Sequence, residues 1–90
     1  MSREGIQKFI DIPNVGKVIE KYFVALGLKR PVELVGKDPF QLHADLCCLM
    51  QKKVDPCVID VFISAVRYME GGLPKKWWEF TEERKKVLGK

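Results

Sequence analysis

The turn at residues 12–17, with the sequence IPNVGK, is the part of this chain best suited to bind a ligand. A helix is predicted to begin just after Gly16, and the first turn of a helix has backbone N–H groups without intrahelical partners. These groups and the helix dipole favour a phosphate. Glycine leaves room for a ligand at the backbone, and the ammonium group of Lys17 adds positive charge. An ordinary corner between two helices, in which Gly16 only permits the bend, explains the same residues.

The single histidine and the three cysteines could supply metal ligands. His43 and Cys47 are four residues apart and share one face of a predicted helix. With Cys57 they make three zinc ligands, but the spacing matches no established zinc pattern and no fourth ligand is evident. Free cysteine is among the most buried residue types, and Cys47 and Cys48 lie in an apolar pattern. The sequence therefore predicts reduced, buried thiols, with no metal, no cofactor and no disulfide.

Cys57 also has to be considered as a nucleophile, because it lies in the predicted first turn of a helix. The helix dipole would favour the thiolate, and the neighbouring carboxylate of Asp55 would oppose it. No histidine, asparagine or second thiol is adjacent in sequence to complete a catalytic or redox pair. A structural role is therefore predicted for Cys57.

Two tryptophans, Trp77 and Trp78, follow Lys75-Lys76 near the end of the chain. Lysines beside aromatic rings can bind single-stranded nucleic acid by charge and stacking. The alternative is that this tail folds back and inserts its tryptophans into the core. A 90-residue domain needs that apolar area, so we expect at least one of the two rings to be anchored in the body of the domain.

The elements that would position these residues are helices, because helical periodicity recurs along the chain and strand alternation does not. The predicted helices cover about residues 4–11, 17–26, 39–50 and 56–70, with one helical turn at 31–35 and a short final helix that Thr81 begins and caps. Asp38-Pro39 and Asp55-Pro56 are typical helix starts, a capping side chain followed by proline. Gly27 and Gly71-Gly72 are stops.

The helix at 56–70 is predicted to be the most buried, because apolar residues occupy nearly all of its circumference. Only Asp60, Ser64 and Arg67 form a polar strip along it. The helix at 39–50 is expected to bury Leu42, Leu46 and Leu49. These two patterns predict one core formed by several helices.

Composition limits the classes of protein that this chain can represent. An apolar fraction of 47% and a charged fraction of 31% are those of an ordinary globular domain. No apolar run approaches the roughly 20 residues that span a bilayer, and the first residues do not resemble a signal peptide. Residues 1–74 carry ten Lys/Arg and nine Asp/Glu, whereas residues 75–90 carry six and three. We therefore expect a cytoplasmic protein with no membrane partner and only a weakly basic body.

The hairpin, closed by Gly27-Leu28, resembles the helix-hairpin-helix motif of DNA repair and recombination proteins. Three further motifs, DPCVIDVF (55–62), AVRY (65–68) and WWEFT (77–81), resemble the bacterial pathogenicity-locus family of small helix-hairpin-helix proteins. Some members of that family are labelled mitomycin resistance proteins. The resemblance covers about residues 6–81 and implies a compact helical domain, with a fold similar to the C-terminal domain of TfoX-type competence regulators. It implies no established biochemical activity.

The hairpin departs from the general motif at two positions. Asn14 replaces the usual glycine, which is tolerable because asparagine adopts left-handed backbone angles. Glu20 replaces a small residue, and its carboxylate lies one turn from the proposed phosphate site. The second departure weakens the interpretation as a DNA-binding site.

Together these patterns predict an all-α, compact helical domain with a helix-hairpin-helix motif, SAM-like in architecture, with about five helices. Residues 1–90 are expected to form one domain, with its core at about 4–72 and a tail at 73–90. The predicted function is a non-catalytic DNA-binding module that contacts backbone phosphates without sequence specificity; the alternative is a protein-interaction module. The expected nucleic-acid-binding residues are Asn14, Val15, Gly16, Lys17, Val18 and Lys21.

Overall fold

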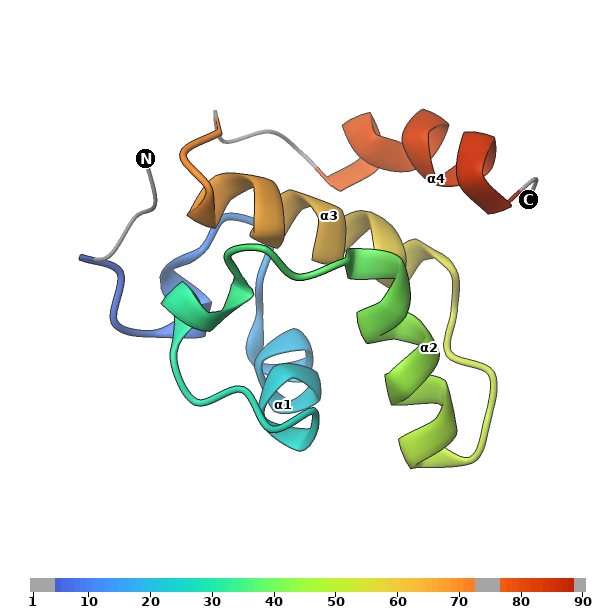
Figure 1. The fold of residues 1–90 in the computed structure, drawn as a ribbon, viewed down its shortest axis with the longest axis horizontal. Helices are drawn as coiled ribbons and strands as arrows, with labels where there is room; N and C mark the ends of the chain where they lie inside the picture. Colours follow the sequence, from blue (N-terminus) through green and yellow to red (C-terminus); the bar gives the residue numbers. More distant parts are fainter. Residues whose placement is uncertain (1–4, 73–76, 89–90) are drawn as a thin grey trace.

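Helix α3 (Cys57–Met69) is the element against which most of the described elements pack. The computed structural model describes residues 5–72 and 77–88. Their elements are, in order, η1 (Phe9–Asp11), α1 (Lys17–Ala25), η2 (Pro31–Leu34), α2 (Pro39–Met50), α3, η3 (Trp77–Phe80) and α4 (Thr81–Leu88), where η denotes a 3-10 helix. No β-strand occurs in these described ranges, so the predicted all-α class is confirmed. Figure 1 shows α3 crossing the molecule, with α4 along one side and α1 and α2 on the other.

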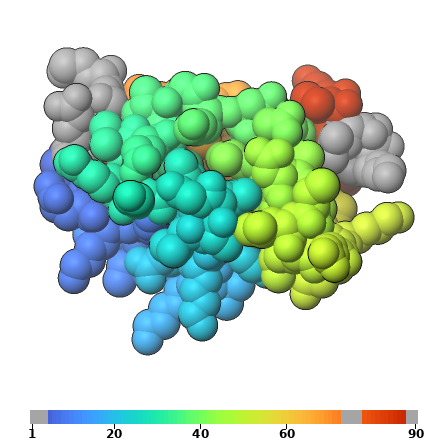
Figure 2. Space-filling view, turned by 60° about the horizontal axis from the view of Figure 1, so that its bottom comes forward, coloured from blue at the N-terminus to red at the C-terminus, as the bar shows by residue number. Residues whose placement is uncertain are grey.

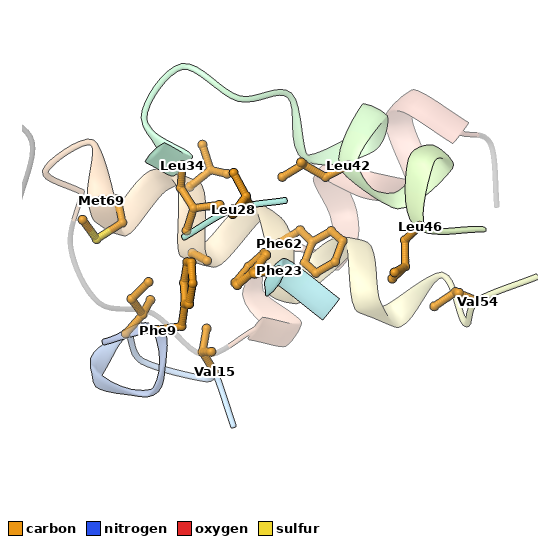
Figure 3. Packing of buried hydrophobic residues seen from close by; sticks show 13 residues of the cluster. Phe9, Val15, Phe23, Leu28, Leu34, Leu42, Leu46, Val54, Phe62 and Met69 are labelled. Atoms are coloured by element: carbon orange, nitrogen blue, oxygen red, sulfur yellow. The ribbon is translucent and has the colours of Figure 1, made fainter. Parts of the chain in front are cut away.

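The core is a continuous apolar cluster in which three aromatic rings follow one another. The ring of Phe23 in α1 lies 5.1 Å from that of Phe9 and 5.1 Å from that of Phe62 in α3, measured between centroids. Phe23 and Phe62 have no exposed surface, and Figure 3 shows their rings between the leucines of α2 and η2 and the side chains of Phe9 and Val15. The predicted central position of α3 is thus confirmed.

Local signals in the sequence set most helix ends where they were expected. The carboxylate of Asp38 accepts the N–H of Phe40 at 2.9 Å, and that of Asp55 accepts the N–H of Cys57 at 2.8 Å. Gly27, with φ +89°, ends α1, and the N–H of Leu28 closes the end by donating to the carbonyl of Phe23. Helix α2 instead ends at Gln51, which adopts φ +54°.

The predicted first helix, at about residues 4–11, was wrong. The described part of that segment contains only the 3-10 turn η1 at Phe9–Asp11. A segment this short is a marginal helix by itself, and packing decides its conformation: Phe9 and Ile12 are buried in the core, while Ile10 is 44% exposed. The turn at 12–17 therefore joins a 3-10 turn to a helix, and the structure does not show a helix-hairpin-helix.

Burial departs from the prediction at several positions. Leu49, expected in the core, is 54% exposed. Cys48 and Cys57 are exposed and Cys47 is half-buried, so the cysteines are not the buried thiols that were expected. Asp60 and Ser64, expected to form a polar strip, are buried, because other segments of the chain cover them.

The C-terminal segment folds back onto α3, and among its described side chains Phe80 is the apolar one that is buried there. Phe80 is 8% exposed and packs with Ile59 and Ile63 in a second, smaller apolar cluster. Trp78 is 57% exposed, and the side chain of Trp77 lies outside the described part of the chain. Thr81 is the first residue of α4, and its hydroxyl donates to Asp60 at 2.8 Å.

Candidate nucleic-acid interface

The turn before α1 is held in place by contacts on both of its sides. Asn14 adopts φ +71°, the left-handed conformation expected of it, and its side-chain amide donates to the hydroxyl of Ser64 at 3.0 Å. The N–H of Val15 donates to the carbonyl of Ile12 at 3.1 Å. The turn is therefore anchored directly on α3, and the start of α1 has a fixed orientation.

Gly16 is not required by the backbone of the turn. Its φ of −102° and ψ of −170° lie in the extended region that any residue adopts. A Cβ atom placed on Gly16 would meet no atom within 4 Å. Gly16 is exposed and, among the described residues, no side chain caps α1. The bare backbone at this position is thus open to an external group.

The structure brings together most of the predicted binding residues on the exposed side of α1. Lys17 and Lys21 are exposed, and Val18 is 60% exposed. Figure 2 shows α1, in light blue to cyan, projecting from this face between the N-terminal segment and the end of α2. Glu20 is half-buried on the same helix, so its carboxylate opposes an anion near the first turn.

Val15 differs from the other predicted binding residues. Its side chain is 6% exposed and belongs to the core, and its N–H is already used within the turn. Val15 therefore contributes to the shape of the turn rather than to its surface. The donors left at the start of α1 are the N–H groups of its first turn, beginning at Gly16.

The histidine and cysteines considered as metal ligands are not brought together as a site. The ring of His43 lies 3.8 Å from the sulfur of Cys47, and its Nε2 lies 2.9 Å from the carbonyl oxygen of Val54. The N–H of Val54 donates to that sulfur at 3.4 Å. His43 and Cys47 thus tie the α2–α3 connection to α2, and Cys57 lies elsewhere, beside Arg84. Within the described residues no three His, Cys, Asp or Glu side chains are grouped as metal ligands.

A polar cluster between α3 and α4 was not predicted from the sequence. The carboxylate of Asp60, which is fully buried, accepts the Thr81 hydroxyl and lies 3.4 Å from Nε of Arg84. Arg84 is 7% exposed, and its Nη1 lies 3.8 Å from the sulfur of Cys57. On the surface, Arg67 and Glu83 form a second ion pair between the same helices. The sequence feature that could have indicated this cluster is Asp60, a carboxylate on a helix whose circumference is nearly all apolar.

With the fold and the turn established, the chain can be assigned to a class of small all-helical domains. A profile of the pathogenicity-locus family, Cdd1, matches residues 2–86. Mitomycin resistance protein McrB of Streptomyces lavendulae is 35% identical over 75 residues, which make up 83% of this chain and 71% of that protein. The chain therefore belongs to the pathogenicity-locus family, which confirms the resemblance seen in its motifs.

No solved structure was found to match the chain. The similarity in fold to the TfoX-type regulators therefore stays a prediction. In the part of the chain that the structure describes, none of the helices has the length and apolar character needed to cross a bilayer.

Proposed function

We propose that the protein is a non-catalytic DNA-binding module that contacts backbone phosphates through the start of α1. The observation that supports this most is Gly16, an exposed glycine with ordinary backbone angles and open space around it, which the fold does not require. A phosphate at this point would accept backbone N–H groups in line with the dipole of a nine-residue helix. Lys17 and Lys21 supply nearby positive charge.

The expected binding is weak and tolerant of sequence, because phosphate contacts convey no base identity. One short turn reaches few phosphates, and a dissociation constant of roughly 10⁻⁴–10⁻⁶ M is expected, the range of non-specific binding. Fluorescence anisotropy with labelled single- and double-stranded DNA, at two salt concentrations, measures both the affinity and its salt dependence. Affinity should fall as salt rises.

Three substitutions test whether the turn is the binding site. Lys17→Ala should weaken binding equally on unrelated sequences and lower the salt slope by roughly one. Gly16→Val should abolish binding by blocking the backbone, and the open space around Gly16 predicts an unchanged melting temperature. Glu20→Ala should strengthen binding by removing an opposing charge. Lys52→Ala, which removes an exposed lysine from the α2–α3 connection, is the matched control and should have little effect.

The second candidate is a protein-interaction module, favoured by large apolar side chains at the surface. Val18 and Val24 on α1 and Leu49 on α2 are each more than half exposed. If the folded protein has no affinity for DNA at low salt, or if Lys17→Ala changes nothing, the turn is a structural corner and this second function replaces the first.

The relative in Streptomyces lavendulae is named for resistance to mitomycin. We infer that this chain also affects sensitivity to the drug. Expression in a mitomycin-sensitive bacterium should raise survival, and the Gly16→Val variant should not, if resistance depends on the proposed interface. Equal survival with the chain and with an empty vector contradicts the inference.

A further inference from the structure

Cys57 occupies an unusual position that the proposed interface does not use. It is exposed, and it is the first residue of α3, a 13-residue helix whose dipole favours negative charge at this end. Its sulfur lies 3.8 Å from Nη1 of Arg84, which donates to it. A thiol in such surroundings is of the kind that reacts, whereas the sequence had suggested a structural role.

Arg84 gives a second reason to expect negative charge to be favoured on the sulfur of Cys57, because this arginine is more than nine-tenths buried. A guanidinium carries five N–H donors, and among the described residues Nε of Arg84 has no hydrogen-bond acceptor even though Asp60 is close. A buried guanidinium with too few acceptors favours a further anionic group beside it. Nε of Arg84 faces Asp60 Oδ1 at 3.4 Å, and Nη1 of the same guanidinium faces the sulfur of Cys57 at 3.8 Å.

The other charged groups around Cys57 affect how strongly a negative charge on its sulfur is favoured. Asp55 accepts the N–H of Cys57 and opposes negative charge on the sulfur, but this carboxylate is exposed and solvent screens it. Asp60 already interacts with Arg84 and reduces its effect.

We propose that Cys57 is a site of covalent modification by small carbon electrophiles, with Arg84 as the residue that positions its sulfur. The thiol gives its proton to solvent, and a sulfur electron pair forms the S–C bond. The bond between carbon and the leaving group breaks at the same time, and the leaving group departs with that electron pair. No oxidant or reductant is consumed. This inference does not depend on DNA binding.

The test compares Cys57 with Cys48, an exposed thiol in α2 of the same chain. The folded protein is treated with limiting iodoacetamide at neutral pH, and peptide mass spectrometry gives the rate at each cysteine. Cys57 should react about tenfold faster than Cys48, and the two rates should converge in urea. Equal rates in the folded chain, or a slower rate at Cys57, overturn the proposal without any variant.

Variants then test whether the charges of Arg84 and Asp55, and not exposure alone, set the reaction rate of Cys57. Asp55→Asn keeps an acceptor for the N–H of Cys57 and should raise its rate. Arg84→Gln should lower the rate toward that of Cys48, and Arg84→Lys should restore part of it. If Arg84→Gln does not fold, the Asp55→Asn result decides: a rate at Cys57 that stays the same contradicts the role of local charge.

Discussion

Replacing Asp60 with asparagine should destabilise the fold by about 3–5 kcal/mol, the usual cost of leaving one member of a buried ion pair alone. Asparagine matches aspartate in shape, and its side-chain oxygen can still accept the Thr81 hydroxyl. The substitution therefore removes the charge and little else. Arg84, which is 7% exposed, is left without its counter-charge. A 90-residue domain has a total stability of roughly 5–13 kcal/mol, so the loss is a large share of it.

Urea denaturation followed by circular dichroism measures this change directly. With a slope of about 1.5 kcal/mol per molar urea, the midpoint should fall by about 2–3 M. The double variant Asp60→Leu with Arg84→Met is the matched control, because replacing both charges with apolar groups is often neutral or stabilising. A loss below about 1 kcal/mol for Asp60→Asn would refute the reasoning, since the pair would then be worth no more than a surface ion pair.

Three further predictions concern the core, the tail and the start of α3. Phe62→Ala should cost about 3–5 kcal/mol in urea denaturation, because Phe62 is fully buried, and a loss below about 1 kcal/mol would mean that the core lies elsewhere. Truncation after Gly72 should lower the melting temperature, because it removes Phe80 from its contact with Ile59 and Ile63, and an unchanged value would show that the tail contributes nothing. The hydrogen bond from the N–H of Cys57 holds the pKa of the Asp55 carboxyl below its ordinary value of 3.8, so its stabilising effect is complete above that pH and is lost as the pH falls through the lower, folded-state pKa. The difference in unfolding free energy between the chain and Asp55→Ala should therefore be constant at neutral pH and shrink below about pH 4, and a difference that persists in acid would contradict this account.

The helices could be predicted from the sequence because their limits are set by neighbouring residues. Asp38 and Asp55 bind N–H groups two residues ahead, and Gly27 ends α1 through its own backbone angle. The conformation around Phe9 could not be predicted in this way. A short segment takes the form that its buried side chains allow, and here the contact between Phe9 and Phe23 is a tertiary one.

Some features of the candidate site could be predicted from neighbouring residues in the sequence, and others depend on contacts between distant residues. The composition and order of the turn at 12–17 indicated an exposed Gly16 beside Lys17, and the structure has them so. The burial of Asp60 and Ser64 could not be predicted, because their partners Thr81 and Asn14 are 21 and 50 residues away. The exposure of Cys57 at the start of α3 was likewise not predicted.

The contacts that hold α4 on α3 determine which of the two helices opens first. Where the structure describes it, α4 meets α3 through charged and hydroxyl side chains, with Arg84 and Thr81 on Asp60 and Glu83 on Arg67. Elements held by few buried apolar contacts open locally at a lower free energy than the whole domain. Amide hydrogens of α4 should therefore exchange with solvent well before those of α3. Salt should speed this local exchange through the exposed Arg67–Glu83 pair, because the buried Asp60–Arg84 pair is screened much less.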